Sequence, residues 1–178
     1  MRWLYPRALW RMDKNEKAVY LTFDDGPIPE VTPWVLDVLD TYGVKATFFM
    51  VGENAERYPD LLARVRAEGH AIGNHTFHHL RGCKVCTEKY LSDTEKANKI
   101  LHTHRFRPPH GRMKYSQKKQ LLRIGHTIYL WDVLTHDYNS RYDTAHMLSI
   151  IQHYTRNGSI ITLHDSLKSK DRMLQLLP

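Results

Sequence analysis

Two aspartates, Asp24 and Asp25, stand side by side in the segment TFDDGP (residues 22–27), directly after a short apolar run. Asp, Gly and Pro are also common where a strand ends in a turn, so the pair could simply be solvated. Two adjacent carboxylates can also divide the work of a hydrolase, because one can bind a metal ion while the other accepts a proton from water. The pair alone leaves open which carboxylate does which.

Two histidines supply further ligands for such an ion. His75 and His79 stand four residues apart in HTFHH, and on a helical turn this spacing would place both rings on one face. Two imidazoles and one carboxylate, with a further position left for water, form the ligand set of hydrolytic zinc sites. The sequence therefore indicates one divalent metal ion, with zinc as the first choice and cobalt, nickel or manganese as alternatives that the same ligands suit.

Short β-rich runs alternate with longer amphipathic stretches along the chain. The segments expected to form strands are residues 19–23, 45–51, 70–74, a short stretch near Phe106, 126–131 and 158–164. The segments expected to form helices are residues 30–42, 54–68, 86–103, 115–124 and 142–156. This alternation predicts an α/β fold with a parallel sheet and crossover helices, either an open doubly wound sheet or a barrel.

Polar residues at the ends of the predicted strands favour the barrel, because functional residues of α/β barrels lie where strands end and loops begin. The polar residues at such ends are Asp24, Asp25, His75, His79, Arg107, Asp132, Asp137 and His164. All of them are therefore expected on one rim.

Four motifs, taken together, resemble those of the polysaccharide deacetylases of the NodB-homology type, also called carbohydrate esterase family 4. They are TFDDGP, HTFHH, RPPHG and the late ITLHD, in this order along most of the chain. The resemblance implies a deformed (β/α) barrel that uses a divalent metal ion to hydrolyse N-acetyl or O-acetyl groups on sugars. Members usually continue with a further helix and strand, so the barrel is expected to be incomplete at its C-terminal end.

The resemblance also implies a role for each site residue. The implied catalytic residues are Asp24 as general base, Arg107 orienting it, His164 as the acid that protonates the leaving group, and Asp137 holding that histidine. The implied metal ligands are Asp25, His75 and His79. The residues expected to contact substrate are Pro109, His110, Gly111, Trp131 and Tyr138.

At four positions the sequence departs from the family pattern. His110 stands where members usually carry Tyr or Phe, and the other changes are Tyr138 for Trp, Leu134 for Asp and Thr162 for Leu. A backbone N–H at position 110 can still help to bind an oxyanion, whatever its side chain. These changes concern the pocket walls, so they bear on substrate identity more than on catalysis.

The overall composition describes one domain. A chain of 178 residues that is 42% hydrophobic can bury one substantial core, so we expect residues 1–18 to pack as an extension on a catalytic domain of residues 19–178, acting as a monomer. The net charge is +7, but the basic residues are spread out and no nucleic-acid motif frames them, so nucleic acid is not an expected partner. Cys83 and Cys86 complete no second ligand set and are expected to be ordinary thiols.

The sequence shows neither a signal peptide nor a membrane-spanning segment, which predicts a cytoplasmic or membrane-surface protein unless an export signal has been removed. The expected activity is hydrolytic removal of acetyl groups, N-acetyl before O-acetyl, from a carbohydrate such as an N-acetylglucosamine-containing glycan. Two alternatives stay open. One is a deacylase of a lipid-linked sugar or other small amide, suggested by the Trp- and Arg-rich N-terminus, and the other is a glycan-binding homologue with impaired catalysis.

Overall fold

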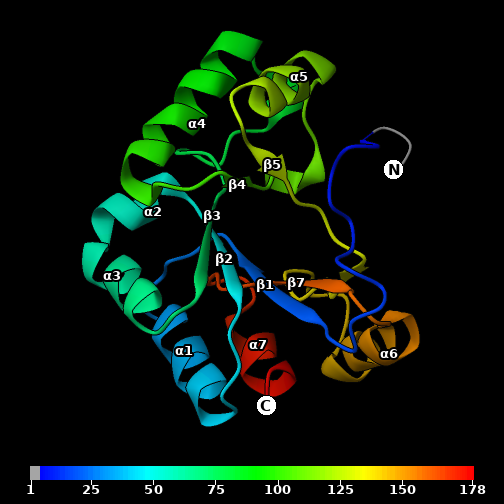
Figure 1. Ribbon diagram of the computed structural model, residues 1–178. Helices are drawn as coiled ribbons and strands as arrows, with labels where there is room; N and C mark the ends of the chain where they lie inside the picture. Colours follow the sequence, from blue (N-terminus) through cyan, green and yellow to red (C-terminus); the bar gives the residue numbers. More distant parts are fainter. Residues whose placement is uncertain (1–4) are drawn as a thin grey trace.

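A single parallel sheet organises the computed structural model, which describes residues 5–178 (Figure 1). Its strands are β1 (Tyr20–Asp24), β2 (Thr47–Met50), β3 (Ala71–Asn74), β4 (Arg105–Phe106), β5 (Thr127–Ile128), β6 (Val133–Leu134) and β7 (Ile160–His164). Their order is β5-β4-β3-β2-β1-β7-β6, and every neighbouring pair is parallel. The sheet curls without closing, because β5 and β6 are its two edges. The predicted deformed barrel is confirmed, and its opening lies between β5 and β6.

Helices cover the outer face of the curled sheet (Figure 1). The α-helices are α1 (Thr32–Thr41), α2 (Gly52–Arg57), α3 (Pro59–Ala67), α4 (Thr87–Leu101), α5 (Tyr115–Arg123), α6 (Thr144–Tyr154) and α7 (Lys170–Leu176), with short 3-10 turns η2 (Gly82–Lys84) and η3 (Pro109–Gly111). The single helix predicted over residues 54–68 is wrong. It is divided at Tyr58, which takes a non-helical conformation (φ −126°, ψ 63°) because the residue before a proline is driven out of the helical region.

Two elements were not predicted from the sequence. Strand β6 has two residues, too few for an alternating pattern to show, and helix α7 follows the last recognised motif. The predicted strand over residues 126–131 is also shorter than expected, because only the two residues of β5 pair in the sheet.

The core consists of two clusters of buried side chains. The larger packs the sheet against its flanking helices and includes Phe23, Phe48 and Leu36. The smaller lies around β4 and β5 and includes Phe106, Ile128 and, from the N-terminal segment, Tyr5. Burial of such large side chains is the main force that fixes the strands, at about 1.5–3 kcal/mol for each fully buried one.

The N-terminal segment lies along the open side of the sheet (Figure 1). The backbone of Leu9 bonds Ile128 and Leu130 at 2.8 Å each, and Met12 N–H donates to the carbonyl of Gly158 at 2.8 Å. The segment therefore covers the edge of β5, which would otherwise expose unpaired backbone groups. Of the Trp- and Arg-rich stretch, Arg2, Trp3 and Leu4 lie outside the described residues.

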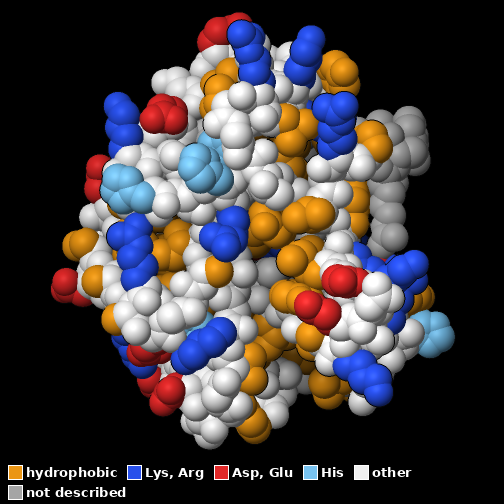
Figure 2. Space-filling view, viewed as in Figure 1, with side chains coloured by type: hydrophobic (Ala, Val, Ile, Leu, Met, Phe, Trp, Pro, Cys, Tyr) orange, Lys and Arg blue, Asp and Glu red, His pale blue; other side chains and the backbone are white. Residues whose placement is uncertain are grey.

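Surface charge is dispersed on the face that Figure 2 shows, where Lys and Arg side chains lie among acidic and hydrophobic ones. Within residues 5–178 no helix combines the length and the apolar character that crossing a bilayer requires.

Candidate active site

The carboxyl ends of the parallel strands meet at one edge of the sheet and carry the polar side chains there. Asp24 ends β1 beside His164, its register partner at the end of β7. Asn74 of β3 and Phe106 of β4 are register partners. The residues that follow them, His75 and Arg107, therefore lie side by side at the ends of these strands. A pocket of about 500 Å³ opens at this edge, and we call it the rim pocket. It is lined by Asp24, Asp25, His75, His79, Arg81, His110, Arg112, Trp131, Leu134, Tyr138, His164, Ser166 and Lys168.

Asp25, His75 and His79 form a cluster with the donor atoms of a metal site. Their candidate ligand atoms all lie within 4.8 Å of one another. Asp25 Oδ1 is 3.2 Å from His79 Nε2 and 3.7 Å from His75 Nε2. Among the described residues, no other group of His, Cys, Asp and Glu is arranged in this way.

A loop, and not the expected helical turn, brings the two histidines together. His75 directly follows β3, and the chain then turns through left-handed conformations at Thr76 (φ 63°) and His79 (φ 52°). The carboxylate of Asp93 on α4 holds this loop by accepting the backbone N–H groups of Phe77 at 2.8 Å and His78 at 3.0 Å. The prediction of a shared helical face was therefore wrong, although the rings do converge.

Hydrogen bonding and burial set the tautomer of His75 and the charge states of His75 and Asp25, and both favour binding of a cation. His75 Nδ1 donates to the carbonyl of Arg107 at 2.8 Å, which leaves the lone pair of Nε2 facing Asp25. Burial lowers the pKa of His75 to about 4, so its ring is neutral. Burial alone would raise the pKa of Asp25, but the hydrogen bond from His79 and the electrostatic effect of the surrounding histidine rings outweigh it and hold that pKa well below its usual range.

Asp24 forms a buried ion pair with Arg107. The guanidinium is fully buried, and its Nη1 donates to Asp24 Oδ1 at 2.6 Å and to Thr22 Oγ1 at 2.8 Å. Its Nη2 donates to the carbonyl of Leu130 at 3.1 Å, and the ring of Phe49 lies 4.1 Å below the guanidinium carbon. A charge this deep is stable only when paired and hydrogen-bonded, so the arrangement fixes the orientation of Asp24 while that residue still lines the pocket.

His164 is held in place by Asp137. Asp137 is fully buried and accepts both the Nδ1–H and the backbone N–H of His164, each at 2.7 Å. Burial by itself lowers the pKa of His164, but the hydrogen bond and charge of Asp137, together with the charges of Asp24 and Asp25, outweigh it and raise the pKa to about 9. The ring is therefore an imidazolium at neutral pH.

Residues 11–129 match the protein family described as polysaccharide deacetylase. The chain belongs to the polysaccharide deacetylase family. It is similar to a peptidoglycan-N-acetylglucosamine deacetylase of Bacillus cereus, with 35% identity over 176 residues that cover 94% of this chain and 82% of that protein. It is also similar to a chitooligosaccharide deacetylase of Azorhizobium caulinodans, with 34% identity over 162 residues that cover 87% of this chain and 77% of the relative.

The fold agrees with this family assignment. The crystal structure of the Bc1960 peptidoglycan N-acetylglucosamine deacetylase aligns with a TM-score of 0.85 and 32% sequence identity, covering 100% of this chain and 88% of that one.

The substrate contacts expected from the family are only partly on the pocket wall. His110, Trp131 and Tyr138 line the rim pocket, and the Tyr138 ring lies 4.9 Å from that of His164. Pro109 does not line it, because it faces a neighbouring pocket. Gly111 is also absent from the wall and lies beneath Trp131, where a Cβ would approach the indole to 2.4 Å.

His110, the departure from the family pattern, has its own set of contacts. Its backbone is left-handed (φ 58°), its ring lies 4.7 Å from that of His79 at an interplanar angle of 57°, and its Nε2 accepts a hydrogen bond from Arg81 Nε at 3.3 Å. Burial, with the charges of His79 and Arg81, lowers the pKa of His110 to about 4. The neutral ring can therefore accept from Arg81, which a phenylalanine could not do.

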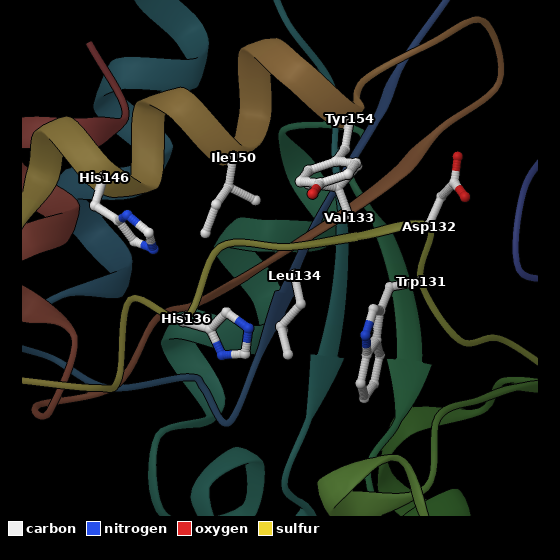
Figure 3. Close-up of a pocket in the computed structure, with 8 residues that line it drawn as sticks. All are labelled: Trp131, Asp132, Val133, Leu134, His136, His146, Ile150 and Tyr154. Atoms are coloured by element: carbon white, nitrogen blue, oxygen red, sulfur yellow. The ribbon is translucent and has the colours of Figure 1, made fainter. Parts of the chain in front are cut away.

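Asp132 is not a rim residue, contrary to the sequence expectation. It precedes β6, where its carboxylate accepts from Arg156 Nε at 3.0 Å and from Ser159 Oγ at 2.8 Å. Figure 3 shows the groove beside it, between β6 and helix α6, which shares Trp131 and Leu134 with the rim pocket. Asp132 therefore stabilises the loop before β7 and does not line the rim pocket.

Sequence reasoning missed Asp165, which shapes the loop that carries Asp25. Its buried carboxylate accepts from Gly26 N–H at 3.0 Å and Thr32 Oγ1 at 2.7 Å. A Cβ at Gly26 would lie 2.0 Å from that carboxylate, so only glycine fits there. Burial raises the pKa of Asp165 to about 8. The sequence signal that could have revealed Asp165 is its position directly after His164 in the motif ITLHD.

Proposed function

We propose that this chain is a metal-dependent hydrolase that removes N-acetyl groups from an N-acetylglucosamine-containing glycan. The observation that carries the proposal is that the two adjacent aspartates have different partners. Asp24 is paired with the buried Arg107, whereas Asp25 belongs to the cluster with His75 and His79. Both carboxylates share one pocket with a protonated histidine, which is the set of groups that metal-assisted amide hydrolysis requires.

Asp25, His75 and His79 would hold one divalent ion, with zinc as the first choice. The cluster fits such an ion because it offers an ionised carboxylate and a neutral imidazole whose Nε2 faces inward. When bound, the ion supplies Lewis-acid polarisation of the acetyl carbonyl and acidifies water at the site. Cobalt, nickel and manganese suit the same ligands.

The other residues move the protons. Asp24 accepts the proton of the attacking water, and the hydrogen bond from Arg107 holds Asp24 in the orientation for that transfer. His164 donates its proton to the leaving nitrogen, and Asp137 keeps the ring charged and fixed. The backbone N–H of His110 would contribute to oxyanion binding, as the family resemblance implies.

The charge state of His164 favours an amide substrate over an ester. An amine leaves only after its nitrogen has been protonated, whereas an alkoxide is a much better leaving group. A histidine that remains an imidazolium up to about pH 9 can supply the proton that an amine leaving group requires.

Acetate release tests the proposal. The purified chain, stripped with a chelator and then reloaded with one equivalent of zinc, is expected to release acetate from a tetramer of N-acetylglucosamine and to lose that activity on stripping. Acetyl-xylan tests the ester reaction, and an N-acylated lipid-linked sugar tests the alternative deacylase. Saccharide binding without acetate release from any of these substrates, at full metal occupancy, would contradict the proposal in favour of a binding protein.

A further inference from the structure

A second pocket opens beside the rim pocket, on the side of His110. Its volume is about 410 Å³, and we call it the cationic pocket. It is lined by Arg81, Gly82, Cys83, Lys84, Pro109, His110 and Arg112. Arg81, His110 and Arg112 line the rim pocket as well, so the two cavities share a wall.

The cationic pocket carries positive charge that nothing in the described chain neutralises. Three of its lining residues are Arg81, Lys84 and Arg112, and none is acidic. Within residues 5–178, no ion pair joins any of the three to a carboxylate.

Some other arginines of this protein do have acidic partners. Arg64 pairs with Asp37, and Arg156 pairs with Asp132. The carboxylates of the neighbouring rim pocket are already engaged, Asp24 by Arg107 and Asp25 by the two histidines. Arginines elsewhere, such as Arg105 and Arg141, also form no ion pair within the described residues, so the cationic pocket is distinguished by gathering three such side chains around one cavity that has no acidic lining residue.

The backbone that carries these cations is fixed. Gln117 on α5 is fully buried, and its Nε2 donates to the carbonyl of Gly82 at 2.9 Å. Lys84 N–H donates to the carbonyl of Arg81 at 2.8 Å, which closes the η2 turn. A Cβ at Gly82 would come within 2.9 Å of Met113 Cα, so the η2 turn packs directly against the segment that carries Arg112. This packing fixes the backbone positions from which the exposed side chains of Arg81, Lys84 and Arg112 reach the pocket.

We propose that the cationic pocket is an anion subsite, which binds a carboxylate or phosphate carried by the glycan beside the sugar that is deacetylated. The inference rests on the proposed function for the position of that sugar, and it names the substrate class as an acidic N-acetylated glycan. Guanidinium groups bind planar carboxylates and phosphates through paired hydrogen bonds, and the shared wall places such a group next to the reacting sugar. A neutral glycan would leave all three cations without a partner.

The experiment compares saccharides that differ in charge and little else. The carboxylate probe is a tetrasaccharide of alternating N-acetylglucosamine and N-acetylmuramic acid with free lactyl groups, and its neutral twin has those groups converted to amides. A 6-phosphorylated N-acetylglucosamine tetramer and its unphosphorylated parent form the phosphate arm. The dissociation constant is measured by calorimetry and kcat/KM by acetate release, each at low and at high salt.

We expect the zinc-loaded chain to prefer one charged probe over its neutral twin by about tenfold at low salt, and by less at high salt because exposed charges are screened. The arm with the larger preference identifies the anion as carboxylate or phosphate. Lys84 borders the cationic pocket and not the rim pocket, so Lys84→Gln should reduce the preference about fivefold, and Lys84→Arg should retain it. Lys99→Gln, which removes an exposed charge from α4, is the matched control and should leave the preference unchanged.

The two readouts separate failure of the subsite from failure of the proposed function. Equal binding of charged and neutral twins in both arms, or a preference that Lys84→Gln leaves intact, overturns the anion subsite even if acetate is released. A binding preference that Lys84→Gln reduces supports the subsite, even if no acetate is released and the proposed activity is wrong.

Discussion

Two histidines of the rim pocket, the buried His75 after β3 and the partly buried His164 at the end of β7, have different charge states. Each donates Nδ1–H to an oxygen at almost the same distance, 2.8 Å for His75 and 2.7 Å for His164. The acceptor of His75 is the neutral carbonyl of Arg107, whereas that of His164 is the carboxylate of Asp137. The pKa is accordingly lowered to about 4 in His75 by burial and raised to about 9 in His164, where the carboxylate outweighs burial.

The charge of the acceptor, and not the length of the hydrogen bond, therefore sets the chemistry of each ring. A neutral imidazole has a lone pair to offer to a metal ion, and an imidazolium has a proton to offer to a leaving group. The same residue type thus performs two incompatible tasks across one pocket.

The largest difference is expected between alanine variants of the two histidines. His75→Ala should lose both the bound metal and the activity, because it removes a ligand. His164→Ala should keep its metal while its rate falls by about 10² to 10⁴, the usual contribution of a general acid. Elemental analysis and acetate release measure the two effects, and full metal occupancy in His75→Ala would rule out the ligand assignment.

Variants of the two adjacent aspartates should also differ from each other in their response to metal. Asp24→Asn should keep its metal and lose about 10² to 10⁴ in rate, as expected on removal of a general base, and added metal should not restore it. Asp25→Asn should bind metal more weakly, because an amide oxygen is an uncharged ligand, so excess metal should partly restore its rate. An equal response of both variants to metal would show that the two roles are shared.

A stability measurement is the control for Asp24→Asn. Its partner Arg107 is fully buried and would lose its counter-charge, and breaking a buried pair from one side costs about 3–5 kcal/mol. Chemical denaturation gives the free energy of unfolding, and assays below the melting temperature of the variant separate lost catalysis from lost folding.

Asp137→Asn should shift the pH dependence of the rate more than its maximum. In the native chain the rate should fall as the pH rises through about 9, where His164 loses its proton. Without the carboxylate, burial lowers the pKa of His164, so the alkaline limb should move to lower pH. A profile of kcat/KM against pH measures this shift, and an unmoved limb would show that His164 is not the titrating acid.

The same pair makes stability depend on pH. Because the pKa of His164 is raised from 6.5 to about 9 on folding, its contribution is fully present below pH 6.5 and is lost as the pH rises through 9. The melting temperature of Asp137→Asn should therefore differ most from that of the native chain at acidic to neutral pH.

The smallest effect is expected for Cys83→Ser combined with Cys86→Ser. Both thiols are free and exposed, and neither lines the rim pocket. Turnover of a neutral tetramer of N-acetylglucosamine should stay within a few-fold of the native value, as expected when no catalytic contact is lost. A collapse in rate with normal folding and metal content would instead indicate a functional role for the pair.

The sequence by itself determined the kinds of side chain and the strand ends that carry them. Parallel strands bring their carboxyl ends to one edge, so the alternating pattern was enough to place Asp24, His75 and His164 together. It was not enough for Asp132, which also follows a predicted strand, because the unforeseen β6 continues the chain beyond it. A strand of two residues leaves no periodic signal.

Only the tertiary structure decided which state each of these groups adopts. The acceptor of His75 lies 32 residues away in sequence and that of His164 lies 27 residues away, and no local pattern links them. The same is true of the cationic pocket, where Gln117 holds the carbonyl of Gly82 across 35 residues. Side-chain chemistry is a property of the residue, whereas its pKa, tautomer and orientation depend on partners and burial that only the folded chain brings together.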